Sequence, residues 1–335
     1  MTLRVGINGF GRIGRLALRA ILESGRSDIQ VVALNDLGSV KDNAHLFKYD
    51  SVHGTFPGVV EAAPEALIID GQSITVCAHK NPADLPWKDL GVDLVMECTG
   101  LFTKREEAAA HLAAGAKKVL ISAPAEGADM TVVYGVNHQA LRAQHTIVSN
   151  ASCTTNCLAP VAYVLDKTIG IQHGFMTTIH SYTGDQRLLD TLHKDLRRAR
   201  AAALSMIPAS TGAAKAVGLV LPQLQGKLDG TAVRVPTPNV SLVDLKFVAS
   251  RPTSKSEINE LMTHAAETEL RGILGINNDP LVSCDFNHNP CSSVFDLTET
   301  HVVDGTFCRI LSWYDNEWGF ANRMADTALA MSTAR

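Results

Sequence analysis

The stretch LRVGINGFGRIG, residues 3–14, decides the fold of this chain. Its alternating first half predicts a β-strand, and its second half is a G-x-G-x-x-G motif that opens a run of apolar residues at helical spacing. A second apolar strand, residues 29–34, is followed by Asn35 and Asp36. Strand, glycine turn, helix, strand and acid in this order indicate a dinucleotide-binding βαβ unit. The alternative is a glycine-rich turn without a ligand.

Each residue of the motif has a physical task in that interpretation. Gly9 permits the tight turn, Gly11 lets the backbone approach a pyrophosphate, and Gly14 allows the helix to pack closely on the strand. The N-terminus of the helix attracts the phosphates. Asp36 can bind the ribose hydroxyls and repels a 2′-phosphate, and Leu37 adds no polar group, so NAD is favoured over NADP.

The rest of the first half continues the pattern of an α/β protein. We expect strands over residues 91–98, 117–122 and 131–136, a helix over 104–114, and a hairpin whose strands, 67–69 and 74–76, meet at Asp70-Gly71. These elements predict a Rossmann-type, doubly wound, mostly parallel sheet with an inserted hairpin.

After residue 165 the alternation of strands and helices stops, which predicts a second domain. We expect strands over residues 174–181, 233–235, 240–248, 281–286, 293–297 and 306–314, and helices over 211–221, 256–270 and 316–331. Residues 182–200 form a long polar stretch without a pattern, which is typical of a functional or interfacial loop.

This organisation predicts an α/β fold with two domains. Residues 1–151 form the dinucleotide-binding domain, and residues 152–315 form an α+β catalytic domain with a mainly antiparallel sheet. The C-terminal helix, about residues 316–335, is expected to pack back on the first domain.

Composition excludes several classes of function. The 335 residues carry a net charge of −4, so no basic excess supports nucleic-acid binding. No apolar run approaches the ~20 residues of a membrane span, and the strand pattern from the first residues leaves no targeting segment. Seven cysteines, an odd number, favour reduced thiols and a cytoplasmic location.

A second informative stretch is SNASCTTNC, residues 149–157. It lies between an apolar strand, 146–148, and an apolar helix, 158–165, so Cys153 is expected at a helix start, where N–H groups and the helix dipole favour the thiolate. Cys153 is therefore a candidate nucleophile, and a buried inert cysteine is the alternative. Cys157 lacks partners at zinc-ligand spacing, so no metal site is expected, and a regulatory disulfide with Cys153 is a weaker option.

Twelve histidines could serve Cys153 as a base, and spacing alone does not choose among them. His180 ends an apolar strand and begins the long polar stretch, which makes it the first choice.

Seven motifs together resemble one family over residues 7–328. INGFGRIGR (7–15), KYDSVHG (48–54), SNASCTTNCLAP (149–160), HSYTGDQR (180–187), STGAAKAVG (210–218), RVPTPNVS (234–241) and WYDNEWG (313–319) are very similar to phosphorylating glyceraldehyde-3-phosphate dehydrogenases of glycolysis and gluconeogenesis. Erythrose-4-phosphate dehydrogenase is the sister family and remains the alternative; it tends to carry glutamate where Asp36 stands.

The resemblance implies a covalent mechanism on Cys153. The thiolate attacks the aldehyde of glyceraldehyde 3-phosphate, and His180 acts as the base while a hydride leaves for NAD. The Cys153 N–H and His180 hold the oxyanion, and inorganic phosphate then cleaves the thioester. Cofactor-binding residues by the same resemblance, besides the three glycines, are Arg12, Ile13, Asp36, Lys80, Ser122 and Asn316.

Two anion sites follow from the same resemblance. Thr183 and Arg234 are expected to bind the substrate phosphate. The attacking phosphate is assigned to Ser152, Thr154, Thr211, Gly212 and an arginine of the Arg197/Arg198 pair, for which we take Arg198. Hydroxyls and guanidinium groups suit phosphate, although Thr211 could instead cap the following helix, and Arg234 could be an exposed edge residue.

Leu192 departs from the family pattern. Strictly NAD-dependent members commonly carry proline there, and NADP-using chloroplast-type members carry a small polar residue, so some NADP activity stays open. The family is a homotetramer whose loop over residues 182–200 lies against a neighbouring subunit's cofactor site. A dinucleotide-binding regulator without catalysis is a further alternative, which the presence of Cys153 and His180 disfavours.

Overall fold

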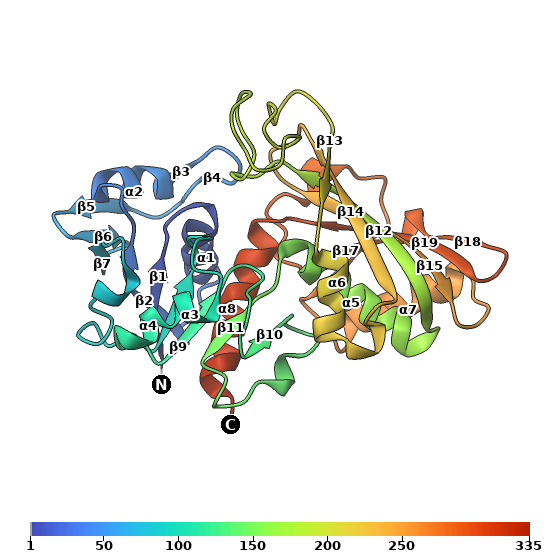
Figure 1. The fold of residues 1–335 in the computed structure, drawn as a ribbon, viewed down its shortest axis with the longest axis horizontal. Coiled ribbons are helices and arrows are strands. Elements are labelled where there is room, and N and C mark those ends of the chain that lie inside the picture. The colour runs from blue at the N-terminus through green and yellow to red at the C-terminus, as the bar shows by residue number, and fades with distance from the viewer. Residues whose placement is uncertain (1) are drawn as a thin grey trace. The chain divides into compact units, whose positions relative to one another are not determined.

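The computed structural model describes residues 2–335 and divides into two compact units. The first unit contains the chain up to Ser152 together with Ala321–Arg335, and the second contains Cys153–Phe320. Figure 1 shows the helices and strands of both units.

The first unit is built on a nine-stranded sheet within the described residues. Its order is β10-β11-β9-β8-β1-β2-β7-β6-β5, and the first seven of these strands pair in parallel. The strands are β1 (Leu3–Asn8), β2 (Ile29–Asn35), β5 (Val60–Ala63), β6 (Ala66–Ile69), β7 (Gln72–Cys77), β8 (Leu94–Glu97), β9 (Lys118–Ile121), β10 (Met130–Thr131) and β11 (Ile147–Ser149).

The predicted hairpin is confirmed, and it is part of the main sheet. Strands β6 and β7 pair antiparallel across Asp70 and Gly71, whose φ values of +48° and +80° suit a tight hairpin turn. Strand β7 also pairs in parallel with β2. The hairpin therefore extends the dinucleotide-binding sheet instead of standing apart from it.

Helices pack against this sheet. Helix α1 (Arg12–Glu23) follows the glycine turn and buries Leu16, Ala17 and Ile21, as its apolar spacing predicts. The remaining helices of this unit are α2 (Val40–Lys48), α3 (Arg105–Ala108), α4 (Ala110–Ala113), η1 (Pro82–Asp84) and η2 (His138–Ala140), and a small sheet joins β3 (Tyr49–Asp50) to β4 (Gly54–Thr55).

Two expected elements of this unit differ in the structure. The helix over 104–114 is interrupted at Ala109, whose carbonyl accepts from Leu112 N as well as Ala113 N and so tightens the turn. The strand over 131–136 stops at Thr131. The Asn137 side chain accepts from Val133 N and donates to Thr131 O. These two hydrogen bonds take the place of those that a neighbouring strand would make, so the backbone turns here.

The second unit contains helix α5 (Cys153–Thr168) and an eight-stranded sheet. The sheet order is β13-β14-β12-β15-β19-β17-β16, with β18 paired to β19, and most pairs are antiparallel. The strands are β12 (Ile171–Ser181), β13 (Ile207–Ser210), β14 (Leu228–Val235), β15 (Ser241–Ala249), β16 (Leu274–Asn277), β17 (Ser293–Asp296), β18 (His301–Val303) and β19 (Phe307–Tyr314). The predicted fold class is confirmed.

Residues 281–286 do not form the expected strand. Asp285 accepts a hydrogen bond from Val282 N at 2.8 Å, which starts a 3-10 helix, η4 (Ser283–Phe286). The other helices are α6 (Ala213–Val220), α7 (Lys255–Glu267), α8 (Trp318–Thr333), η3 (Pro222–Leu224) and η5 (Leu297–Glu299). Within residues 2–335, no helix is both long and apolar enough to cross a bilayer.

The end of the chain belongs largely to the first unit. The later turns of α8 contact that unit through Asp326, which pairs with Arg26 at 3.1 Å, and Thr327, whose hydroxyl donates to Asn150 Oδ1. These contacts tie the last helix to the segment before β2 and to the residue that follows β11.

Candidate active site

The glycine turn of the first unit leaves room for a ligand. Gly9 has a φ of +88°, and a Cβ there would lie 2.7 Å from Thr99 N. A Cβ at Gly14 would lie 2.1 Å from Gly9 O, which explains the close packing of α1 on the end of β1. A Cβ at Gly11 would meet nothing within 4 Å, so the backbone at the start of α1 faces open space. This cradle fits a dinucleotide pyrophosphate.

Asp36 lies next to this turn. Its Oδ2 accepts from Phe10 N at 3.0 Å, and its Oδ1 accepts from Gly38 N at 2.9 Å. Both carboxylate oxygens are thus oriented by the backbone and keep further lone pairs for a ligand's hydroxyl groups. Asp36 therefore ties the end of β2 to the glycine turn.

A pocket of about 310 Å³ opens at the carboxyl ends of these strands. Of the predicted cofactor residues, Gly9, Gly11, Asp36 and Lys80 line it. The other residues that line it are Asn8, Asn35, Leu37, His79, Cys98, Thr99, Leu101 and Phe102. Most of these end a strand or lie within two residues of its end, so the rule that ligands bind beyond the carboxyl ends of parallel strands could have identified them.

Arg12, Ile13, Gly14 and Ser122 do not line this pocket. Arg12 Nη1 pairs with Asp50 at 2.5 Å. Burial would raise the pKa of Asp50, but Arg12 and the N–H groups of His53 and Val52 outweigh it and hold the pKa at about 2. Ser122 hydrogen-bonds Cys98, which does line the pocket.

Cys153 and His180 meet in the second unit. Cys153 is the first residue of α5, and His180 is the penultimate residue of β12. Cys153 Sγ lies 3.5 Å from His180 Nε2. The structure thus brings together the two residues that the sequence singled out for catalysis.

The hydrogen bonds of His180 define its tautomer. Nδ1 lies 2.7 Å from Ser181 O, an acceptor, and 3.3 Å from Arg234 Nη1, a donor, and the shorter contact assigns the proton to Nδ1. Nε2 then presents its lone pair to the Cys153 thiol. This is the orientation in which an imidazole can accept the thiol proton.

The electrostatics favour a neutral pair. Burial, with the charges of Arg234 and Arg198, lowers the pKa of His180 to about 3. Burial also raises the pKa of Cys153, although Arg234 and Thr154 oppose that shift. The N–H groups of Thr154 and Cys153 at the helix start lower the pKa of Cys153, as expected, but burial outweighs them in the free chain.

The sequence analysis did not identify Tyr314, which contacts the residues around the Cys153–His180 pair. Its hydroxyl lies 2.8 Å from Thr154 Oγ1 and 3.0 Å from Thr178 Oγ1, and its ring makes an edge contact with His180. Tyr314 is 160 positions from Thr154 in the chain. No local pattern signals such a contact, although Tyr314 belongs to the motif WYDNEWG.

Arg234 and Thr183 lie together beside His180. Arg234 Nη1 lies 3.3 Å from Thr183 Oγ1 and donates to Ser181 O at 3.0 Å. Within the described residues, Arg234 Nε is buried and has no hydrogen-bond partner. A buried guanidinium with a free donor beside a hydroxyl is suited to an anion. Arg234 is thus not an exposed edge residue.

Two of the residues assigned to the attacking phosphate form hydrogen bonds with residues outside that set. Arg198 pairs with Asp185 at 2.5 Å and with Asp195 at 3.5 Å, so its charge is partly compensated. Thr211 Oγ1 accepts from Ala213 N, as the capping alternative predicted. Gly212 is the N-cap of α6, and a Cβ there would meet nothing within 4 Å. Ser152 directly precedes Cys153 in the chain.

Asn316 is held in one orientation. Its Oδ1 accepts from Ser181 Oγ and Ser241 Oγ, both at 2.8 Å. Two donors on one oxygen fix the amide, so its nitrogen faces away from the serines. Ser181 and Ser241 are positioning residues that the sequence analysis did not identify.

Cys157 lies in a different environment from Cys153. It is fully buried, and its Sγ lies 3.3 Å from Ser293 Oγ. Burial raises its pKa to about 12, so it carries little thiolate at neutral pH and is a poor partner for disulfide exchange. Across residues 2–335, no group of three or more side chains is arranged to hold a metal ion.

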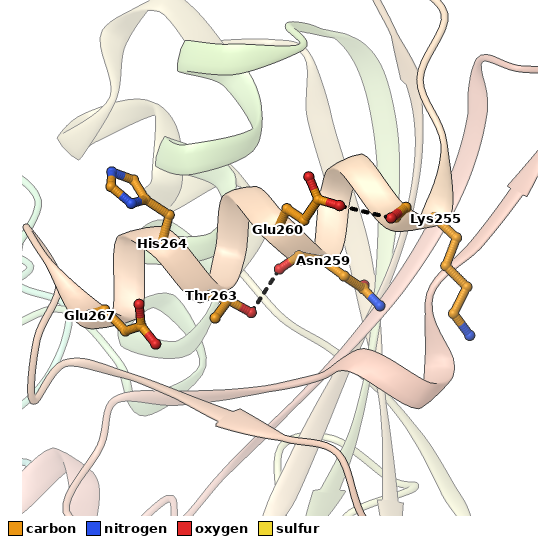
Figure 2. A pocket seen from close by; sticks show the side chains of 7 residues that line it. Lys255, Asn259, Glu260, Thr263, His264 and Glu267 are labelled. Atoms are coloured by element: carbon orange, nitrogen blue, oxygen red, sulfur yellow. Dashed lines mark hydrogen bonds between the residues drawn. The ribbon is translucent and has the colours of Figure 1, made fainter.

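A hollow on α7 offers no comparable chemistry. Figure 2 shows its side chains, which come from one helix and lie along it instead of converging. Ser256 donates to Glu260, and Thr263 donates to Asn259 O, so these polar groups are satisfied within the helix.

The fold and the glycine turn define a dinucleotide-binding enzyme, and its second unit places a cysteine beside a histidine. Residues 3–105 match the family described as glyceraldehyde 3-phosphate dehydrogenase, NAD binding domain, and residues 152–316 match the glyceraldehyde 3-phosphate dehydrogenase C-terminal domain. The chain belongs to the glyceraldehyde-3-phosphate dehydrogenase family.

Relatives match it along its full length. The chain is 68% identical to glyceraldehyde-3-phosphate dehydrogenase of Xanthobacter flavus and 65% identical to that of Cereibacter sphaeroides, with 99% of each chain covered. It is 62% identical to the Pseudomonas aeruginosa enzyme of the same name, over 100% of both chains.

Proposed function

We propose that this chain oxidises and phosphorylates D-glyceraldehyde 3-phosphate to 1,3-bisphosphoglycerate, with NAD as the oxidant and a thioester on Cys153. The observation that carries the proposal is the Cys153–His180 pair, 3.5 Å apart, in a chain of this family. NAD, when bound, supplies the acceptor for a hydride.

Cys153 and His180 act in sequence on the aldehyde. The lone pair of His180 Nε2 takes the thiol proton as Sγ attacks the carbonyl carbon, so the neutral resting pair becomes reactive only when a substrate is present. The Cys153 N–H at the start of α5 and the protonated imidazole then stabilise the oxyanion. After hydride loss the acyl group stays on Sγ as a thioester.

Phosphate chemistry requires two anion sites near the nucleophile. Arg234 and Thr183 bind the phosphate of the substrate, supported by their contact and by the free Arg234 Nε. Ser152, Thr154, Thr211, Gly212 and Arg198 bind the attacking phosphate. Inorganic phosphate adds to the thioester carbon, the Cys153 sulfur leaves as thiolate, and the acyl phosphate is released.

The two units divide these tasks. The unit up to Ser152, with the C-terminal helix, binds NAD, and the unit from Cys153 carries the catalytic residues. Asp36 selects NAD over NADP because a carboxylate repels a 2′-phosphate.

We also propose that the chain assembles as a homotetramer in the cytoplasm. Leu188, Leu192, Leu196 and Leu204 are each more than three-quarters exposed in one irregular loop. Several exposed leucines in one loop are typical of a surface that another subunit covers.

One assay tests the activity. Formation of NADH from NAD, or of NADPH from NADP, is measured with glyceraldehyde 3-phosphate and with erythrose 4-phosphate, each with and without phosphate. We expect turnover to require phosphate and to be fastest with the triose and NAD. Faster turnover of the tetrose would favour the sister activity, and comparable kcat/KM with NADP would contradict the role of Asp36.

Cys153→Ser tests the mechanism in the same assay. Since a serine hydroxyl is a much weaker nucleophile, kcat should fall by at least about a thousandfold. Cys157→Ala is the matched control, because Cys157 is a neighbouring buried thiol outside the proposed chemistry, and it should keep most of the activity. Turnover of the serine variant near that of the unmodified chain would refute the covalent step.

A further inference from the structure

A row of polar side chains lies buried beneath the dinucleotide pocket. Glu97, Asn8 and Asn35 are the last residues of β8, β1 and β2, and the sheet register places them side by side. Each is at most 5% exposed. Asn8 and Asn35 also line the pocket, so the row forms its floor.

Glu97 receives donors on both of its oxygens. Asn8 Nδ2 donates to Oε2 at 2.6 Å, and His111 Nε2 lies 2.8 Å from the same oxygen. Thr99 donates to Oε1 through both its backbone N–H, at 2.8 Å, and its hydroxyl. Four donors on two oxygens require a side chain that accepts on both oxygens, whereas an amide would place a donor against donors.

Trp87 determines which nitrogen of His111 donates to Glu97. Its indole N–H can only donate, and it donates to His111 Nδ1 at 3.0 Å. His111 therefore carries its proton on Nε2 and donates it to Glu97. Because His111 is fully buried, neither its tautomer nor its ring orientation can adjust to water.

The network extends from Glu97 to the residues that would touch a dinucleotide. Asn8 Oδ1 accepts from Asn35 Nδ2 at 2.7 Å, and Asn35 Oδ1 accepts from His79 N at 2.8 Å. This bond fixes the backbone that leads into Lys80. On the other side, Glu97 holds Thr99, whose N lies close enough to Gly9 to exclude a Cβ there.

We propose that Glu97 is a positioning residue for the NAD site: its buried carboxylate holds together the ends of four adjacent strands, β8, β1, β2 and β7, whose following residues line the dinucleotide pocket. The proposal rests on the proposed function, because it assumes that NAD binds there. Glu97 acts through Asn8, Asn35 and Thr99 and needs no contact with the cofactor.

Glu97→Gln tests this with almost no change in volume. In either orientation of the amide, its NH₂ group replaces an oxygen that accepted two hydrogen bonds. The hydrogen bonds on that side of residue 97 are therefore lost. We expect the Kd for NAD, measured by calorimetry at a temperature where the variant is folded, to rise at least about tenfold. In steady state KM for NAD should rise, while kcat changes by no more than about threefold.

Asp129→Asn is the matched control. Asp129 also accepts backbone N–H bonds, from Thr146 and Ile147, in the same unit, and it does not line the pocket. The Asp129→Asn variant should have a lower melting temperature and an unchanged Kd for NAD. An equal loss of affinity in both variants, or an unchanged Kd in Glu97→Gln, would overturn the positioning role.

Thr99 provides a second test if Glu97→Gln does not fold. Thr99→Val removes the hydroxyl that donates to Glu97, and Thr99→Ser keeps it. We expect weaker NAD binding for the valine variant and affinity within about twofold of the unmodified chain for the serine variant. Equal affinities for the two would contradict the proposal. Absence of NAD binding by the unmodified chain would instead refute the proposed function, and this inference with it.

Discussion

At the scale of single residues, the reactivity of Cys153 is set by what surrounds it and not by its place at a helix start alone. Burial raises its pKa, and the charge of Arg234 lowers it. His180 is kept neutral by burial and by the charges of Arg234 and Arg198. The same arginine thus favours the thiolate of Cys153 and the neutral form of its base.

The influence of Arg234 on the thiol can be measured without a substrate. In Arg234→Gln the opposing charge is lost, so the pKa of Cys153 should rise further and alkylation by iodoacetamide at pH 7.5 should slow severalfold. Arg234→Lys retains a charge and should lie between the glutamine variant and the unmodified chain. Equal alkylation rates for all three would show that Arg234 does not act on the thiol.

The buried neutral His180 also predicts a pH dependence of stability. Its pKa is about 3 in the folded chain, against 6.5 for an exposed histidine. Between these values the unfolded chain binds a proton that the folded chain does not, so the free energy of unfolding contributed by His180 is fully present above pH 6.5 and falls as the pH drops toward 3.

His180→Gln removes this contribution. Between pH 4.5 and 5.5, urea unfolding should show a slope of stability against pH that is smaller by about 1.4 kcal/mol per pH unit than in the unmodified chain. Identical slopes would contradict a buried neutral His180.

At the scale of elements, what could be predicted from the sequence depended on how local the signal was. The βαβ unit, the Asp70-Gly71 hairpin and the start of α5 at Cys153 each depend on neighbouring residues, and each was identified. The expected helix over 104–114 forms but is interrupted at Ala109, and the expected strand over 131–136 stops at Thr131, because side-chain and turn hydrogen bonds compete with the regular pattern there. Contacts such as Tyr314–Thr154 join residues far apart in the chain and leave no local pattern.

The glycine turn after β1 offers a test at this scale. Gly9→Ala introduces a Cβ 2.7 Å from Thr99 N at a φ of +88°, so the turn must shift and NAD affinity should fall at least about tenfold. Gly25→Ala is the control. It also has a positive φ, +63°, but its Cβ meets nothing within 4 Å, so only stability should fall. Similar NAD affinity for the two variants would argue against a precise turn at Gly9.

At the scale of the whole molecule, the pattern of elements changes along the chain. A mostly parallel sheet precedes residue 150, and a mainly antiparallel sheet follows it. The roles within each half came from the motifs, whereas supporting residues such as Glu97, His111 and Ser241 became visible only when the sheets brought them together.

The exposed leucines predict assembly. Sedimentation should give the mass of four chains, and Leu188→Asp with Leu196→Asp should shift the distribution toward smaller species, because burying an unpaired carboxylate is costly. Lys215→Asp is the control, since it introduces the same acid at an exposed site in a different element, α6. A fully active monomer of the unmodified chain would contradict the proposed tetramer.

The acyl group on Cys153 is the central claim, and intact-mass spectrometry tests it most directly. The protein is mixed with NAD and glyceraldehyde 3-phosphate without phosphate and quenched in acid. We predict a mass gain equal to one 3-phosphoglyceroyl group, located by peptide mapping on Cys153, which disappears when phosphate is added before the quench. A chain that forms NADH at full rate with no mass gain on Cys153, or with the same gain in Cys153→Ser, would contradict the account.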